Sequence, residues 1–315
     1  MTANDMTRAA GRIETKDTAK PSQKIIDAMH VVEQAMHNVV RSDVAILQDA
    51  STHILNAGGK RIRPRLMMLG YLACGGTQVA DAAPVAAALE LVHTASVVHD
   101  DINDHGLLRR GRPSVNALWG RTFALLTGDY LFTKVYELMA PYKDLNIIFS
   151  EATGALIEGE TLQASAVKEN NFSREMYMNI ISRKTAALFK AGTELGARLA
   201  DAPEDDVESL AQFGFNVGLA FQIVDDILDL TADDEQLGKT AGIDLQQGKG
   251  IASINNNDPA ASFKQQLMTD ERIQEGQELA RSLVETGIAS IRNLPDSEYK
   301  DELIDLAYLV LDRTQ

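Results

Sequence analysis

The chain has 315 residues, of which 45% are hydrophobic, and its 45 acidic residues outnumber its 30 basic ones to give a formal net charge of −15. This composition can bury a large core and excludes a disordered or fibrous protein. Because nucleic acids are bound through basic surfaces, the charge argues against nucleic acid as a partner. The single cysteine, Cys74, cannot form an intrachain disulfide.

The N-terminal residues 1–22 are polar and lack a sustained apolar period, which predicts a flexible tail. We find no charged-then-apolar leader, and no apolar run that approaches the roughly 18 residues of a membrane span. These features predict a cytoplasmic protein without a membrane span.

From residue 23 onward, apolar residues recur three and four positions apart, which is typical of amphipathic helices. The longest such stretches are residues 25–40, 85–102, 123–139 and 207–230. Breaks are predicted at Gly75–Gly76, Arg109–Arg112, Pro141, Asn170–Asn171, Pro203 and residues 231–250. No segment is a convincing strand-turn-strand unit, and no linker separates domains. We therefore predict an all-α fold, with one helical bundle over residues 23–315.

Two aspartate-rich segments follow apolar helical stretches. In HDDIND, Asp100 and Asp104 share one helix face and Asp101 lies about 100° away. The pattern returns in VDDILD, which contains Asp225, Asp226 and Asp229. Like charges four residues apart weaken a helix by a few tenths of a kcal/mol, so a cation is expected nearby. One such segment is most simply a charged helix end, but two copies behind apolar runs favour a shared function.

Hard carboxylate oxygens without clustered His or Cys suit Mg²⁺, which shares its coordination sphere with substrate phosphates. Zinc is a poor fit to this set of side chains. A glycosidase-like acid/base pair is an alternative, although one carboxyl would then need a dry site to stay protonated at neutral pH. Six acids near several Lys and Arg side chains should instead stay ionised.

Basic residues occur beside glycine or in pairs in four short segments. They are GGKRIRP (58–64), LLRRGRP (107–113), RKTA (183–186) and GKTAGIDLQQGK (238–249). Each alone is most simply a loop or a helix C-cap. Together they could bind phosphate oxygens, since Arg offers a matching fork and glycine allows close backbone approach. About three Mg²⁺ and two diphosphates would nearly balance the charge of six Asp and these cations.

These motifs, with GDYLF and RKTAALF, stand in the order seen in the trans-isoprenyl diphosphate synthases, the polyprenyl synthetase family, which the chain resembles from about residue 25 to residue 249. The resemblance implies an isoprenoid synthase fold: a large single-domain helical bundle around a central cavity, usually in a homodimer. It also implies a prenyltransferase that joins isopentenyl diphosphate to an allylic prenyl diphosphate after Mg²⁺-dependent ionisation. Mn²⁺ can substitute in this chemistry.

The resemblance carries over to individual residues. It implies that Mg²⁺ is bound mainly by Asp100, Asp104 and Asp225, with support from Asp101, Asp226 and Asp229. Isopentenyl diphosphate would be held by Lys60, Arg63, His93 and Arg110. The allylic diphosphate would be held by Arg109, Lys184, Thr185, Gln222, Lys239 and Lys249. In the reaction itself, Lys184, Thr185 and Gln222 would act together with the aspartates.

Two of these residues can also be judged from spacing. His93 could be a core histidine, but its position seven before Asp100 puts it on the same helix face. Gln222 lies three before Asp225 and should sit beside the second acidic motif.

Product length in this family is set by the depth of the cavity beneath the first acidic motif. Ala95 and Ser96, five and four residues before Asp100, are small and leave the cavity open there. Phe132 and Tyr136, on a following helix, are large enough to close it farther down. We therefore expect a medium- or long-chain product, longer than C20, with release close to a membrane.

Three rival functions fit parts of this pattern. A geranylgeranyl or farnesyl diphosphate synthase would differ only in product length. A terpene cyclase of the same fold usually has an Asn/Ser/Glu metal motif in place of the second aspartate motif. A non-catalytic partner subunit typically lacks some of the aspartates or lysines that are present here. One departure from the family is GKGIASINNND, which begins at Gly248 and puts the placement of Lys249 in doubt.

Overall fold

The computed structural model describes residues 21–169, 173–231 and 270–312, and it is helical almost throughout. The α-helices are α1 Gln23–Val39, α2 Ala45–Asn56, α3 Ile62–Ala73, α4 Val79–Asn103, α5 Val115–Trp119, α6 Arg121–Met139, α7 Leu145–Glu169, α8 Arg174–Ile181, α9 Ala187–Leu199, α10 Glu204–Thr231, α14 Asp270–Ser290 and α15 Glu298–Asp312. A π-helical turn, η1 Ser182–Ala186, joins α8 to α9. The predicted all-α fold is confirmed.

The long helices follow the apolar periodicity of the sequence. Apart from Val40, which caps α1, all four predicted stretches fall in single helices, namely α1, α4, α6 and α10. The predicted breaks at Gly75–Gly76, Pro141 and Pro203 are confirmed, because each lies between two helices. The break at Asn170–Asn171 and, apart from Thr231, the break over residues 231–250 lie outside the described residues.

A short β-hairpin follows α4, where the sequence showed no strand-turn-strand pattern, so that prediction was wrong here. Strand β1 (Leu108–Arg109) pairs antiparallel with β2 (Arg112–Pro113). Arg110 and Gly111 form the turn with φ values of 53° and 72°, as two-residue hairpin loops require. Strands of two residues are too short to produce the alternation that identifies a strand in sequence.

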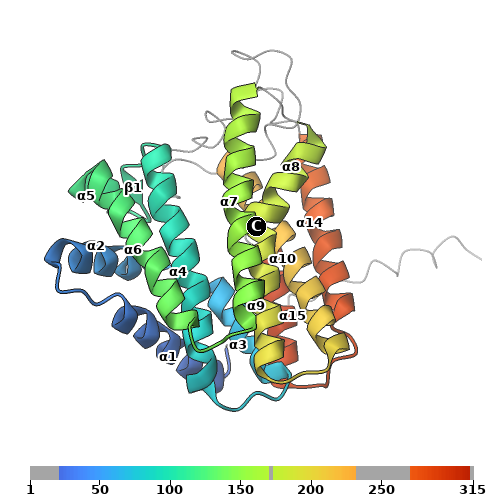
Figure 1. Ribbon diagram of the computed structural model, residues 1–315. Coiled ribbons are helices and arrows are strands. Elements are labelled where there is room, and N and C mark those ends of the chain that lie inside the picture. The colour runs from blue at the N-terminus through green and yellow to red at the C-terminus, as the bar shows by residue number, and fades with distance from the viewer. Residues whose placement is uncertain (1–20, 170–172, 232–269, 313–315) are drawn as a thin grey trace, which may run out of the picture.

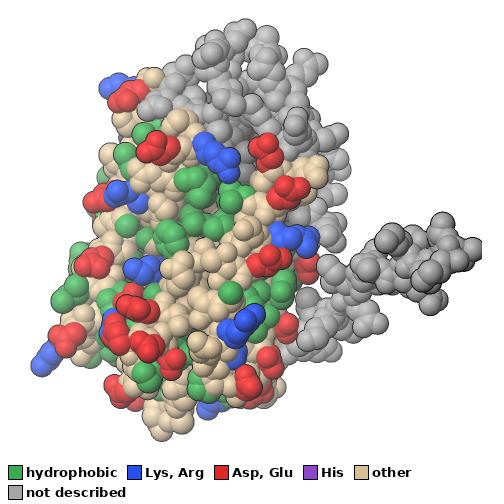
Figure 2. Space-filling model, turned by 90° about the vertical axis from the view of Figure 1, so that its right-hand side faces the viewer, with side chains coloured by type: hydrophobic (Ala, Val, Ile, Leu, Met, Phe, Trp, Pro, Cys, Tyr) green, Lys and Arg blue, Asp and Glu red, His purple; other side chains and the backbone are tan. Residues whose placement is uncertain are grey.

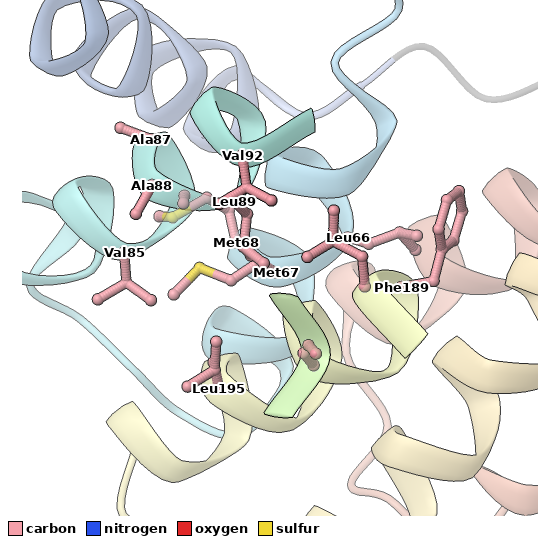
Figure 3. Packing of buried hydrophobic residues seen from close by; sticks show 14 of the residues in the cluster. Leu66, Met67, Met68, Val85, Ala87, Ala88, Leu89, Val92, Phe189 and Leu195 are labelled. Atoms are coloured by element: carbon pink, nitrogen blue, oxygen red, sulfur yellow. The ribbon is translucent and has the colours of Figure 1, made fainter. Parts of the chain in front are cut away.

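The centre of the core lies where α3, α4 and α9 meet, as Figure 3 shows. Its fully buried large side chains include Leu66, Met67, Met68, Leu89, Phe189 and Leu195. Each large apolar side chain removed from water contributes about 1.5–3 kcal/mol. Alanines along α4 are also fully buried, which lets neighbouring helices approach closely. This packing fixes α4, and with it the first acidic motif at the C-terminal end of that helix.

Among the described helices, α4 alone is long and apolar enough to cross a bilayer by length and composition, with a mean hydropathy of 1.2 over its most apolar window. The prediction that no apolar run approaches that length was therefore wrong for α4. Of this window, 78% is buried inside the protein. Such burial is typical of the central helix of a folded core.

The remaining helices enclose this core, as Figure 1 shows. Helix α4 packs most extensively on α6, whereas α10 packs on α9 and α14. The first and last described helices contact the same core, because α1 packs on α4 and α15 packs on α3. On the face drawn in Figure 2, basic side chains lie singly or in small groups among acidic ones. This arrangement differs from the basic stripe of nucleic-acid-binding proteins.

Candidate active site

The first acidic motif occupies the C-terminal end of α4. Asp100 and Asp101 lie in its last turn, and Asp104 is the C-cap residue. Three carboxylates are unfavourable at this position, because the helix dipole is negative at its C-terminus. Cations must offset that cost, and the structure brings them from the β-hairpin and from η1.

Arg109 of the hairpin binds the buried member of this motif. Its Nη2 lies 2.6 Å from Asp101 Oδ1, and its Nε donates to the same oxygen at 3.1 Å. Burial raises the pKa of Asp101, and the contact with Arg109 offsets part of that rise. The second oxygen, Oδ2, is buried without a hydrogen-bond partner among the described residues. An added cation or donor would fit there.

Lys184 of η1 connects the first motif to α7. Its Nζ lies 2.8 Å from Glu160 Oε1 and 3.8 Å from Asp100 Oδ2, and it donates to Gln163 Oε1 at 3.2 Å. The close approach of α7 requires Gly159, since a Cβ there would lie 2.6 Å from the backbone nitrogen of Lys184. Lys184 is thus held between two helices and faces the first acidic motif.

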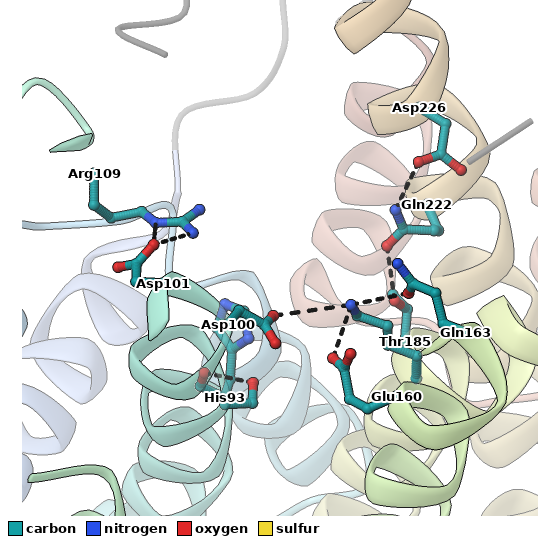
Figure 4. A network of polar contacts seen from close by, with 11 residues as sticks. His93, Asp100, Asp101, Arg109, Glu160, Gln163, Thr185, Gln222 and Asp226 are labelled. Atoms are coloured by element: carbon teal, nitrogen blue, oxygen red, sulfur yellow. Dashed lines mark hydrogen bonds and ion pairs between the residues drawn. The ribbon is translucent and has the colours of Figure 1, made fainter. Parts of the chain in front are cut away.

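The second acidic motif lies in the last two turns of α10, and its buried residue is Asp226. Thr185 Oγ1 donates to Gln222 Oε1 at 2.7 Å, and Gln222 Nε2 donates to Asp226 Oδ1 at 3.0 Å. Figure 4 shows this chain of contacts opposite Asp100, with Glu160 and Gln163 between the two sides. The structure therefore brings the two predicted motifs to facing positions.

Tyr177 of α8 completes the contacts of Asp226. Its hydroxyl donates to Asp226 Oδ2 at 2.5 Å. Burial, and then the adjacent Asp226 carboxylate, raise the pKa of Tyr177 well above its usual value. The hydroxyl therefore stays a protonated donor at neutral pH.

The residues predicted to hold isopentenyl diphosphate gather around the start of α3 and the middle of α4. Arg63 lies over the Phe189 ring, 5.0 Å from its centroid, and burial lowers the pKa of Arg63 to about 10, so it stays charged. Burial and then the neighbouring Arg63 and Arg110 hold the pKa of His93 well below its usual value, so His93 is neutral at pH 7. A neutral imidazole can both donate and accept a hydrogen bond.

Arg110 meets the glycine-rich segment directly. A Cβ at Gly59 would lie 2.5 Å from Arg110 Nη1, so a larger residue there would displace the end of the Arg110 side chain. Lys60, the next residue, is exposed. Arg61 holds the segment in place, because its guanidinium donates to Glu33 and Glu90 and to the Leu55 carbonyl. Arg61 thus ties the segment that carries Lys60 and Arg63 to α4, which carries His93, whereas Arg110 comes from the turn of the β-hairpin.

Several predicted residues cannot be placed. Lys239 and Lys249 lie outside the described residues, and so does the side chain of Asp229. Asp225 is half-buried on α10.

Within the described part of the chain, no three acidic, His or Cys side chains converge as a ready-made metal site. Mg²⁺ commonly completes its shell with water and substrate phosphate oxygens, so facing carboxylates without His or Cys fit this ion.

The predicted chain-length residues differ in position. Ala95 is fully buried and Ser96 is nearly so. Phe132 is half-buried, and its ring centroid lies 6.0 Å from that of His99, the residue before Asp100. Tyr136 is 75% exposed. The prediction that Tyr136 closes an interior pocket is therefore wrong for this chain, because the side chain points outward from α6.

Glu160, Gln163 and Tyr177 were not singled out from the sequence. Glu160 and Gln163 are three residues apart in EGETLQ and therefore share a helix face. This spacing could have indicated that they act together. Tyr177 had no local signal, since its partner Asp226 is 49 residues away. The π-turn was also missed, although such turns are frequent at functional sites.

Comparison with known proteins places the chain in one family. A family model described as polyprenyl synthetase matches residues 44–284. The all-trans-nonaprenyl-diphosphate synthase (geranyl-diphosphate specific) of Rhodobacter capsulatus is 36% identical, covering 90% of this chain and 94% of that protein. The octaprenyl diphosphate synthase of Escherichia coli K12 is 32% identical, with coverage of 90% and 94%. The crystal structure of polyprenyl synthase from Caulobacter crescentus CB15, complexed with calcium and isoprenyl diphosphate, has a TM-score of 0.85 and 30% identity, covering 93% of this chain and 96% of that one. The chain belongs to the polyprenyl synthetase family.

Proposed function

We propose that this protein is a trans-prenyltransferase that adds isopentenyl diphosphate to an allylic prenyl diphosphate and makes products longer than C20. The observation that carries the proposal is the facing of two acidic helix ends across Lys184 and Thr185. A separate group of Lys60, Arg63 and Arg110 lies beside α4. One chain thus provides for two diphosphates, as elongation requires and as cyclisation of one substrate does not.

Mg²⁺ is the metal that fits the acidic motifs, and Asp100, Asp104 and Asp225 are the residues that would hold it. When bound, the ion would neutralise charge on the leaving diphosphate. Asp101 is already paired with Arg109, and Asp226 with Tyr177 and Gln222, so their role is to support the outer carboxylates. Mn²⁺ should substitute, since the donors are all hard oxygens.

In the proposed reaction, the carbon–oxygen bond of the allylic diphosphate breaks and its electron pair leaves with the diphosphate. Lys184 and Arg109 place positive charge where that negative charge grows. The Thr185 oxygen and the Gln222 amide lie beside the same space as fixed dipoles for the allylic cation. No protein nucleophile is needed.

Arg63, Arg110 and Lys60 then hold the diphosphate of isopentenyl diphosphate, and neutral His93 adds a hydrogen bond. The double bond attacks the allylic cation and forms a carbon–carbon bond. Loss of one proton to the departed diphosphate restores a double bond. Buried apolar side chains such as Ala95 and Val98 exclude water from the growing cation.

The proposed product length rests on two observations. Ala95 and Ser96, five and four residues before Asp100, have small side chains that are buried in α4. The relatives are named as nonaprenyl and octaprenyl diphosphate synthases, which make chains longer than C20.

The direct test is to incubate purified protein with Mg²⁺, labelled isopentenyl diphosphate and geranyl, farnesyl or geranylgeranyl diphosphate, and to size the products. We expect consumption of both substrates and chains longer than C20. Products that stop at C15 or C20 would contradict the length. A cyclic hydrocarbon made without isopentenyl diphosphate would favour a cyclase, and no turnover would favour a non-catalytic subunit.

We also propose that the protein is a homodimer. Helix α6 exposes Leu125, Leu126 and Tyr136, and α7, the next helix along the chain, exposes Ile147 and Ile157. Exposed large apolar side chains on consecutive helices favour an association surface. Light scattering at micromolar concentration should give twice the 34.3 kDa mass of one chain, and a monomer would contradict the proposal.

Four other features stay predictions. They are the single catalytic domain over residues 23–315, the N-terminal tail, the cytoplasmic location and product release near a membrane.

A further inference from the structure

Tyr177 lies outside every motif that identifies the family in this sequence, yet it contacts the buried aspartate of the second one. It is on α8, with a relative exposure of 5%. Its hydroxyl reaches Asp226 Oδ2 at 2.5 Å while Gln222 Nε2 reaches Oδ1 at 3.0 Å. Both oxygens of this carboxylate therefore accept hydrogen bonds from protein groups.

The chemistry of these groups fixes the direction of each hydrogen bond. An ionised carboxylate only accepts, so Tyr177 must donate to it. Gln222 must turn its NH₂ group to Asp226, which leaves its carbonyl oxygen facing Thr185. Thr185 then spends its one hydroxyl hydrogen on that carbonyl, at 2.7 Å. The oxygen lone pairs of Thr185 are what remain for a bound substrate.

We propose that Tyr177 is a positioning residue for prenyl transfer: by holding Asp226, it fixes the amide of Gln222 and keeps the Thr185 oxygen turned as an acceptor toward the allylic substrate. This inference rests on the proposed function, because the Thr185 oxygen has a role as an acceptor only if an allylic substrate is bound beside it. The contacts from Tyr177 to Thr185 are all made between protein groups.

Without the Tyr177 hydroxyl, Asp226 would keep its charge but lose the contact that orients it. Gln222 could then rotate its amide and present NH₂ to Thr185, which would reverse the Thr185 hydroxyl. A hydrogen would point at the developing cation in place of an oxygen lone pair. Substrate binding should change little, because the charged side chains supply most of the attraction for both diphosphates, whereas Thr185 and Gln222 are neutral.

The test compares Tyr177→Phe with Tyr71→Phe in steady-state assays. Tyr71 is a matched control, with the same 5% exposure and a buried hydroxyl bonded to the Gln78 backbone away from the site. We expect Tyr177→Phe to lower kcat about tenfold, equivalent to about 1.4 kcal/mol in the transition state, with both KM values within about twofold. Tyr71→Phe should lower thermal stability without lowering kcat. Equal kcat for Tyr177→Phe and the unaltered protein, or equal losses in both variants, would overturn the proposal.

A second measurement needs neither metal nor turnover. Thermal unfolding of the metal-free protein is compared for Tyr177→Phe, Gln222→Met and the double variant. Members of one hydrogen-bonded unit give non-additive effects, so the double variant should lose clearly less in Tm than the sum of the single losses. Additive losses in Tm would overturn the proposal. This test still applies if Tyr177→Phe is too unstable for kinetic assays. If the unaltered protein shows no prenyl transfer but the Tm losses are non-additive, the proposed function fails and the contact sequence stands.

Discussion

The two acidic motifs share the pattern Asp-Asp-Ile-X-Asp and both lie near the C-terminal end of a helix, but their buried aspartates, Asp101 and Asp226, are held by different chemistry. In the first, Asp101 is paired with the guanidinium of Arg109, which the β-hairpin supplies. In the second, Asp226 accepts hydrogen bonds from two neutral groups, Tyr177 and Gln222. The first motif is therefore set by charge pairing and the second by oriented dipoles.

This difference gives each motif a distinct dependence on its surroundings. A charge pair tolerates small changes in geometry, and it fails when the cation is removed. The hydrogen bonds of an oriented amide and hydroxyl depend on direction, so the arrangement is lost when one donor is removed. The outer carboxylates, Asp100 and Asp225, are what the motifs have in common, and Lys184 and Thr185 lie between the two sides.

The largest effect is expected where the two motifs are equivalent. Asp100→Ala and Asp225→Ala should each cost at least about 3 kcal/mol of transition-state stabilisation, or roughly 100-fold in kcat/KM. Circular dichroism should show an intact fold, because neither side chain belongs to the core. Near-normal turnover in either variant would show that its motif does not act on the leaving diphosphate.

Removing the cation of the first motif should cost stability as well as activity. Arg109→Met leaves Asp101, whose side chain is 2% exposed, without its charged partner. We expect a loss of about 2–3 kcal/mol in the free energy of unfolding by urea. Arg112→Met on the same hairpin is the control, and should cost about 0.5–1 kcal/mol. Equal losses in the two variants would mean that the pairing of Asp101 is not specific.

A change beneath the first motif should alter the product rather than the rate of ionisation. Ala95→Phe adds a ring one to two turns below Asp100, and product sizing should show shorter chains. Ala95→Ser, which stays small, should leave the product length unchanged. Unchanged length in Ala95→Phe would mean that the chain does not grow along this part of α4.

The smallest effect is expected from His93 on the same helix. Its pKa in the folded protein lies well below the ordinary value of 6.5. The unfolded chain therefore binds a proton first as the pH falls, so stability is present above pH 6.5 and declines below it. His93→Gln should reduce the decline in the free energy of unfolding between pH 7 and pH 5 by about 1 kcal/mol. Tm measured across this pH range would show the difference. Parallel Tm curves for both proteins would contradict a neutral His93.

Spacing alone predicted the acidic motifs, because residues four apart on a helix must share a face. It also predicted the helices that carry Asp100 and Gln222. The resemblance to the family supplied the partners of these residues in the reaction, which spacing could not give. Predictions failed where a contact depends on distant parts of the chain. Tyr177 and Asp226 are 49 residues apart, and no local pattern links them.

Two further features follow from packing between helices. The residues of the π-turn at Ser182–Ala186 have no pattern that distinguishes them from an ordinary helical segment. The close approach of α7 to this turn at Gly159 is evident only from the structure. Tyr136 fits the apolar period of α6 but lies on its outward face. A helix has several sides, and the sequence of one helix does not say which neighbour each side meets.

The most direct test of the central claim is a crystal structure with Mg²⁺ and a non-reactive thio analogue of an allylic diphosphate. We predict that one diphosphate is bound between the two helix ends, with metal ions contacting Asp100 and Asp104 on one side and Asp225 on the other. A diphosphate and its ions bound to one motif alone, with the other motif uninvolved, would contradict the account.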